Sequence, residues 1–377
     1  MLPWPSAHAS PSMASGEPAC RSDVRRAPPG AGKGRLCSTG RAASIAKQVA
    51  AGIAAASLAG SQRGKQRCRQ RLRLSRRGPH RMGLRGAQTA APRQEGPLPY
   101  EVVPVEGKGL GVVATRAIAC GELVMADVPI LTFQGTDGSW VRSVNEQFKA
   151  LRPDEQQTVM ALADVGEPKT VAGIIRTNNY PRGVNSEDGV LCPTFSRFNH
   201  SCEPNCEQSW DEDANQLQAF ACVDIAAGEE LCTYFVDVRD PLASRRQILQ
   251  KVYCFKCNCP VCTSRDPFVE RRRLRMQQLG AKAEATAARN PKRAVRMLAD
   301  LLELYDQAGI RPNVVRKQAC ELAVELFLQS GDLPQAQEAL ELSHKFSTLC
   351  HGPQHAETVR LAGLLKSGLP LQPAPKE

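Results

Sequence analysis

Residues 197–206 read Arg-Phe-Asn-His-Ser-Cys-Glu-Pro-Asn-Cys. This stretch is neither a turn pattern nor a core pattern, because it gathers side-chain amides, an imidazole and thiols within a few residues. Three further motifs flank it in a fixed order. Gly-Lys-Gly-Leu-Gly occupies residues 107–111, Gly-Glu-Glu-Leu occupies 228–231, and Phe-Lys-Cys-Asn-Cys-Pro-Val-Cys occupies 255–262. The four motifs together are far more specific than any one of them alone.

This combination resembles the SET-domain protein lysine methyltransferases, over about residues 98–365. The resemblance implies an α+β fold, in which a β-rich SET fold carries a helical insert and a zinc-binding post-SET tail. An α-helical, tetratricopeptide-like C-terminal domain would follow, as in the SET-and-MYND subfamily. We expect the MYND zinc finger of that subfamily to be absent, because no Cys/His cluster occurs between residues 121 and 191.

The spacing of apolar residues and the positions of Gly and Pro divide the chain into segments. Short strands separated by Gly and Pro predict a β-rich SET domain over residues 98–240. Helical spacing of apolar residues predicts an insert at about 139–175, with a helix start at Pro153. We also expect a strand over residues 231–238, and helix breaks at Asn290-Pro291 and Gly331-Asp332. A post-SET helix and the cysteine cluster occupy 241–265, an α-helical domain occupies 266–367, and a short tail, 368–377, ends the sequence.

The charge is concentrated at one end. The net charge of the 377 residues is +11, of which residues 1–95 contribute +15, leaving −4 for the rest. This first segment has few bulky apolar residues, so we expect it to be disordered. Three roles compete: an organelle transit peptide, a nuclear-localisation or nucleic-acid-contacting arm around Arg63–Arg85, or a solvated tail. The compartment is therefore nucleus or cytoplasm, or alternatively plastid or mitochondrion.

The chain contains 15 cysteines, and four of them fall within residues 254–262. This spacing is typical of a metal site, and no well-formed secretory signal is evident, so a reducing compartment is indicated. The longest candidate for a membrane span, residues 50–60, is short and rich in Ala and Gly. We expect no membrane association.

Three thiolates fall within six residues at Cys257, Cys259 and Cys262. A tetrahedral zinc site needs a fourth ligand. The resemblance implies that Cys202 of the central motif is that ligand, which would fasten the tail to the motif. Cys206 and Cys254 are the alternatives.

The family's cofactor is S-adenosylmethionine, and the resemblance assigns contacts to it. Lys108, Gly109 and Leu110 would line the methionine end, while Asn199 and His200 would contact adenine and ribose. A glycine without Cβ lets the backbone approach a ligand closely.

Two further residues are assigned to the cofactor by the same resemblance. Asn178, which fits better than Asn179, would contact the methionine carboxylate region, although a simple turn is the alternative. Phe255 would stack on adenine, or else pack as an ordinary core residue.

The reaction implied is a direct displacement, in which a neutral lysine amine attacks the sulfonium methyl group. The enzyme aligns the two reactants and keeps the amine deprotonated. The family places its catalytic tyrosine seven residues after Gly228, where this chain has Phe235. We favour Tyr234 as the catalytic hydroxyl, through a local bulge; otherwise Phe235 occupies the site and activity is weak or lost. Arg245, Leu249 and Tyr253 fall at spacing four, on one face of the post-SET helix. Tyr253 is expected to pack in the core or to line the lysine channel.

These observations predict a protein-lysine N-methyltransferase that acts on a protein substrate, histone or non-histone, as a monomer. The alternative is a catalytically weak or inactive SET-fold scaffold that binds proteins through its helical domain. Nucleic acid would be contacted only through the basic leader.

Overall fold

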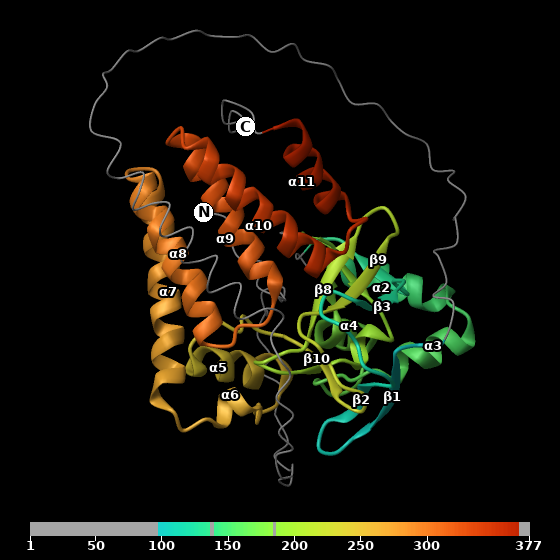
Figure 1. The fold of residues 1–377 in the computed structure, drawn as a ribbon. Helices are drawn as coiled ribbons and strands as arrows, with labels where there is room; N and C mark the ends of the chain where they lie inside the picture. The colour runs from blue at the N-terminus through green and yellow to red at the C-terminus, as the bar shows by residue number, and fades with distance from the viewer. Residues whose placement is uncertain (1–96, 136–138, 184–185, 369–377) are drawn as a thin grey trace, which may run out of the picture.

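The computed structural model describes residues 97–135, 139–183 and 186–368. The predicted basic leader and nearly all of the predicted C-terminal tail lie outside the described residues. A β-rich half and a helical half lie against each other, as Figure 1 shows. The α+β fold class expected from the sequence is confirmed. No helix among the described residues combines the length and the apolar character needed to cross a bilayer.

Three small sheets form the β-rich half. Their strand orders are β1-β2-β10-β7, β3-β9-β8 and β4-β6-β5, and all pairings are antiparallel except the parallel pair of β7 and β10. The strands are β1 (Tyr100–Val105), β2 (Gly109–Ala114), β3 (Leu123–Asp127), β4 (Leu131–Phe133), β5 (Tyr180–Pro181), β6 (Gly189–Leu191), β7 (Asn199–His200), β8 (Cys206–Asp211), β9 (Gln216–Ala221) and β10 (Glu230–Thr233).

The sheets share one apolar core. Apolar residues from all three sheets meet there with the short 3-10 helix η1 (Phe195–Arg197), including Val112, Val124, Val190, Phe195 and Leu231. The strand β9 is buried along its whole length. It lies centrally between β3 and β8, and helix α10 (Leu333–His351) of the helical half packs on it.

The predicted insert is helical. It contains α2 (Trp140–Ala150), α3 (Pro153–Met160) and α4 (Val171–Asn178), which pack with β4 and β6 around their own apolar cluster. Thr170 caps α4 by accepting a hydrogen bond from the backbone N–H of Gly173. The expected helix start at Pro153 is confirmed.

The strand predicted over residues 231–238 is shorter than expected. β10 ends at Thr233, and residues 234–241 form an irregular segment that leads into α5 (Leu242–Tyr253). The strands β7 and β8 were not predicted. β8 reads Cys-Glu-Gln-Ser-Trp-Asp, and its polar side chains are buried by the helical half, so its sequence lacks the usual apolar alternation.

Five helices follow the short α6 (Pro260–Thr263). Asn290 caps the start of α8 and Asp332 caps the start of α10, at the two breaks that the sequence predicted. The first four of these helices pack around one cluster that includes Leu298, Ala323 and Leu326, and the last one packs on α10. They are α7 (Pro267–Ala287), α8 (Pro291–Gln307), α9 (Asn313–Gln329), α10 and α11 (Ala356–Ser367).

Buried polar contacts along β8 join the two halves. Glu207 is 0% exposed and accepts hydrogen bonds from the backbone N–H groups of Asn313 and Val314 at 3.0 Å, at the start of α9. Two residues further along β8, the Ser209 hydroxyl lies 2.7 Å from Nδ1 of His351. The helical half is therefore docked by specific partners as well as by apolar packing.

The Glu207 contact makes stability depend on pH. Burial raises the pKa of Glu207 from 4.5 to about 7, and the hydrogen bonds from Asn313 and Val314 only partly oppose this. The folded protein therefore holds the Glu207 proton more tightly than the unfolded chain. This stabilisation is fully present below about pH 4.5 and is lost as the pH rises through 7.

Between pH 4.5 and pH 8, we expect the free energy of unfolding of the wild type to fall by about 3 kcal/mol more than that of Glu207→Gln. Chemical denaturation across that range measures it. Glu325→Gln is the matched control on an exposed part of α9. Parallel pH curves for the wild type and Glu207→Gln would contradict this expectation.

Candidate cofactor and zinc site

Four buried cysteines converge where the tail meets the central motif. The sulfur atoms of Cys202, Cys257, Cys259 and Cys262 all lie within 4.8 Å of one another. The structure therefore brings together the four residues that the sequence assigned to zinc. Among the described residues, the two alternative cysteines are outside this group: Cys206 lies in β8 and Cys254 ends helix α5.

Local backbone geometry builds the cluster. Cys254 adopts a left-handed conformation (φ 55°) that ends α5 and turns the chain back. The short helix α6 begins after Cys259, and the backbone N–H of Cys262 donates to the carbonyl of Cys259 at 3.0 Å. Cys202 comes from the loop after β7, about 60 residues earlier in the chain.

The donor set fits a tetrahedral zinc ion. Thiolates about 2.3 Å from zinc would lie roughly 3.8 Å apart at tetrahedral angles. The sulfurs of Cys202 and Cys262 lie 3.4 Å apart. Four cysteine sulfurs gathered in this way are the ligand set of a structural zinc site, so the cluster could hold zinc.

His200 is occupied by the protein on both ring nitrogens. Nδ1 accepts a hydrogen bond from the backbone N–H of Phe235 at 3.0 Å, and Nε2 lies 3.2 Å from the sulfur of Cys202. In the neutral ring, the proton is then on Nε2 and points at the cysteine sulfur. The predicted contact of His200 with the cofactor stays a prediction. In the structure, His200 connects the cysteine cluster to the segment after β10.

The glycine motif lies on β2, facing β7 and β10. A Cβ on Gly111 would lie 2.8 Å from Nδ2 of Asn199 and 2.6 Å from the side chain of Val105, so any larger residue would displace these side chains. Gly109 has φ 77° and nothing within 4 Å of its Cβ position, which leaves its backbone open. Leu110 is 42% exposed beside it.

We call the surface formed by residues 108–111 and Asn199 the cradle. Glu230 forms its polar side. Its carboxylate accepts from Nζ of Lys108 at 2.5 Å and from Nδ2 of Asn199 at 2.9 Å. Burial lowers the pKa of Lys108, but the Glu230 hydrogen bond and charge outweigh it, so the net pKa is raised and Lys108 stays charged. Sequence reasoning quoted Glu230 within its motif but assigned it no role.

Asn205 is another polar residue of the central motif without a predicted role. It is buried, its Nδ2 donates to the carbonyl of Glu230 at 2.9 Å, and its Oδ1 accepts from the N–H of Cys232 at 2.8 Å. Asn205 therefore fixes β10 to the loop that carries Cys202.

Asn178 ends helix α4, and its side-chain amide is tied to the fold. Nδ2 donates to the carbonyls of Ala163 and Ile174, both at 2.7 Å. Both amide hydrogens are therefore used, and only Oδ1 could accept a hydrogen bond from a ligand. Asn179 donates in the same way to Ile175 at 2.8 Å, so Asn178 and Asn179 both close the end of α4.

Aromatic rings surround His200. Its ring centroid is 5.4 Å from that of Phe235 and 6.0 Å from that of Phe255. The rings of Phe235 and Tyr253 are 5.0 Å apart. Phe235, Tyr253 and Phe255 belong to the same apolar cluster as the buried cysteines Cys202 and Cys257. We call these three rings and His200 the aromatic wall.

Tyr234 lies on the other side of the chain, and the preference for it as the catalytic hydroxyl is not supported. Its ring is 5% exposed and belongs to the helical core with Met276 and Ile310. Phe235 instead faces His200 and Tyr253. No bulge returns Tyr234 to the site, because β10 ends at Thr233 and the next two side chains, Tyr234 and Phe235, pack in different apolar clusters.

Tyr180 provides a hydroxyl that sequence reasoning did not assign. It follows Asn179 on β5, and its ring packs edge-on against Phe195 at 4.8 Å. Burial raises the pKa of Tyr180, which the neighbouring Thr233 hydroxyl of β10 opposes. Burial raises the pKa of Tyr253 as well. Both phenols therefore stay protonated at neutral pH.

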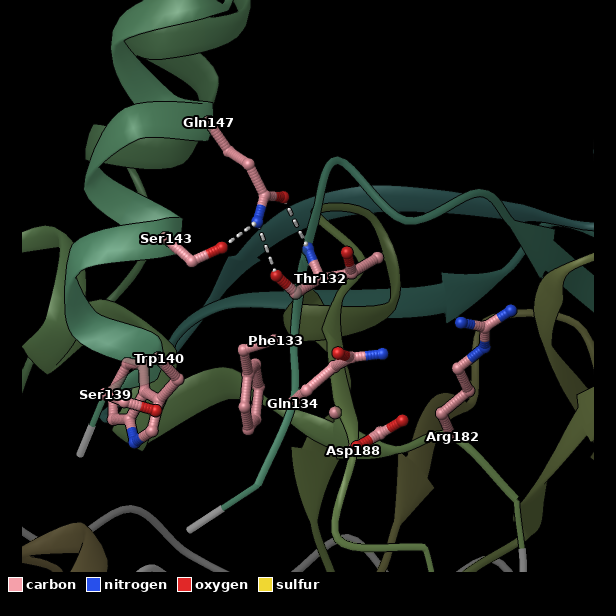
Figure 2. A pocket seen from close by; sticks show the side chains of 10 residues that line it. Thr132, Phe133, Gln134, Ser139, Trp140, Ser143, Gln147, Arg182 and Asp188 are labelled. Atoms are coloured by element: carbon pink, nitrogen blue, oxygen red, sulfur yellow. Dashed lines mark hydrogen bonds between the residues drawn. The ribbon is translucent and has the colours of Figure 1, made fainter. Parts of the chain in front are cut away.

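A separate cavity of about 370 Å³ lies between α2 and the β4-β6-β5 sheet. Figure 2 shows Arg182, Asp188 and Gln134 on one side of it and Gln147 above, where the amide of Gln147 bonds to Thr132. None of the residues predicted for cofactor or metal lines this cavity.

The family model of the SET domain matches residues 109–235, so the chain contains a SET domain. The match begins at Gly109 and ends at Phe235, and it spans the glycine motif, the central motif and β10.

Curated relatives are lysine methyltransferases. The chain is 30% identical over 207 residues to histone-lysine N-methyltransferase set5 of Schizosaccharomyces pombe, covering 53% of this chain and 62% of that protein. It is 40% identical over 81 residues to human histone-lysine N-methyltransferase SMYD3, covering 21% and 18%. It is 39% identical over 82 residues to mouse protein-lysine N-trimethyltransferase SMYD5, covering 21% and 20%. The chain therefore spans less than two thirds of the length of each of these relatives.

Proposed function

We propose that this protein transfers a methyl group from S-adenosylmethionine to the ε-amine of a lysine in a protein substrate. The observation that carries the proposal is the SET-domain match over the residues that build the cradle. The names of the relatives support a protein substrate, and two of the three name histone. We take the substrate class to be protein lysine, with histone as one candidate.

The cradle supports a cofactor site. The open backbone at Gly109 and the exposed Leu110 leave room for a ligand beside Lys108. Asn178 would accept a hydrogen bond through Oδ1 from the ammonium group of the methionine end. Asn199 and the backbone of residue 200 would hold the adenine end, since both ring nitrogens of His200 already have partners within the protein. Phe255 would stack on adenine through its π-face.

We propose that Cys202, Cys257, Cys259 and Cys262 hold one structural zinc ion. The zinc supplies the energy that fixes the tail against the central motif, as structural zinc sites do. Through His200 the same ion would fix the position of the aromatic wall.

The substrate lysine would enter between the aromatic wall and Tyr180. S-adenosylmethionine supplies an electrophilic methyl group when it is bound. The apolar rings of Phe235 and Tyr253 would desolvate the lysine amine, which lowers its pKa and favours the nucleophilic neutral form. The protonated hydroxyls of Tyr180 and Tyr253 would orient that amine. They would act by position and not as bases, because their pKa values are raised.

Calorimetry with S-adenosylmethionine tests the cofactor assignment. Zinc-loaded full-length protein should bind one molecule per chain. No binding by folded, zinc-loaded protein would overturn the proposal. Binding without methylation of any protein pool would favour the alternative, a SET-fold scaffold that binds partners through its helical half.

A methyl group at Gly111 should weaken cofactor binding. In Gly111→Ala the new Cβ would push Asn199 away from Glu230, because it would lie 2.8 Å from Nδ2. Overpacking of this kind costs about 1–3 kcal/mol, so we expect a loss of affinity of about tenfold or more. Gly363→Ala is the control, since nothing lies within 4 Å of that position in α11. Equal affinities of the two variants would contradict this expectation.

A further inference from the structure

Two arginines are buried beneath the cysteine cluster. Arg245 of α5 is 0% exposed and Arg273 of α7 is 1% exposed. Within the part of the chain that the structure describes, neither guanidinium lies within ion-pair distance of a carboxylate, although the charges of Asp240 and Glu270 offset part of theirs. The half-buried Arg239 and the buried Arg316 each form such a pair. A buried charge is strongly unfavourable unless a charge of opposite sign lies near it.

The polar contacts of Arg245 lead to the cluster. Nη2 donates to the sulfur of Cys262 at 3.8 Å, Nη1 donates to the backbone carbonyl of Asp240, and Nε has no partner. Its neighbour Arg246 donates to the carbonyl of Cys262 at 3.0 Å. Helix α5 is thus attached to Cys262 by two consecutive arginines.

Arg273 approaches from the other helix. Its Nε donates to the carbonyl of Val238 at 3.0 Å, and its Nη1 has no partner. Burial, and then repulsion by the positive charge of Arg245, lower the pKa of Arg273. The hydrogen bond to the cluster therefore comes from Arg245.

The charge of a loaded cluster matches this arrangement. Four thiolates and one Zn²⁺ carry a net charge of minus two, which a buried site must neutralise. We propose that Arg245, with Arg273 beside it, is the counter-ion of the zinc-tetrathiolate centre. It is a positioning residue: it joins α5 to the metal, and Tyr253 of the aromatic wall lies two turns further along the same buried face.

This inference rests on the proposed zinc site, and its test reads metal binding directly. Full-length wild type, Arg245→Met, Arg245→Lys and Arg316→Met compete for zinc with a chromophoric chelator. Arg316 is the matched control, a buried arginine of α9 paired with Asp306 at 3.0 Å. Loss of an outer contact to a metal ligand typically weakens binding 10- to 100-fold. We expect a loss in this range for Arg245→Met, most of it recovered in Arg245→Lys, and none in Arg316→Met.

The Co²⁺ complexes give a second readout. The tetrahedral absorption bands of Arg245→Met should shift in position, because the thiolates lose a hydrogen-bonded cation, while those of Arg245→Lys should resemble the wild type. If Arg245→Met does not fold, Arg273→Met replaces it in the same measurements. Equal zinc affinities of wild type and Arg245→Met, or equal losses in the Met and Lys variants, would overturn the counter-ion role. A wild type that binds no zinc would overturn the zinc site as well, whatever its methyltransferase activity.

Discussion

Replacing Tyr180 by Phe should reduce methyl transfer by about 100-fold or more while leaving the fold and cofactor affinity unchanged. The substitution removes only the hydroxyl, so the ring keeps its edge-on packing against Phe195. The loss should fall on kcat, because the hydroxyl orients the reacting amine. Turnover with a labelled methyl donor, beside calorimetry for cofactor binding, measures both quantities.

Tyr234→Phe is the matched control for this prediction. Its ring lies in the helical core, away from the aromatic wall, so turnover should stay close to that of the wild type. An inactive Tyr234→Phe of normal stability, together with a fully active Tyr180→Phe, would restore Tyr234 as the catalytic residue and contradict our account of the site.

Loss of Cys202 should have the second large effect. In Cys202→Ala the cluster keeps only the three tail cysteines, and the tail loses its covalent path through zinc to the central motif. We expect zinc affinity to fall by more than about 100-fold and cofactor binding to be lost with it. Metal analysis of the purified protein and calorimetry measure these two changes.

The alternative cysteines serve as controls. Cys206→Ala and Cys254→Ala should each keep one zinc ion per chain, because neither sulfur belongs to the cluster. If Cys202→Ala retained zinc with unchanged affinity and Cys254→Ala lost it, the ligand set would be wrong.

The sequence predicted those parts of the site that depend on spacing. Three cysteines within six residues require a fourth ligand, and the central motif offered Cys202, which the structure brings to the same place. Likewise Arg245, Leu249 and Tyr253 recur every four residues, and they do share one buried face of α5. Local periodicity was enough in both cases.

Other parts depend on tertiary contacts that one sequence does not reveal. Whether Tyr234 or Phe235 enters the site is decided by the direction of an irregular segment after Thr233, which has no period. The partners of the His200 ring come from residues two positions and 35 positions away. β8 is a polar strand that becomes buried only because the helical half covers it.

Transfer of a labelled methyl group from S-adenosylmethionine to protein lysine is the most direct measurement of the central claim. Zinc-loaded full-length protein is incubated with labelled donor and a pool of proteins that includes histones, and hydrolysates are analysed for methylated lysine. We expect labelled ε-methyllysine that is absent without enzyme and strongly reduced with Tyr180→Phe. Tight binding of the donor with no methyllysine on any protein would contradict the claim and leave a SET-fold scaffold as the better account.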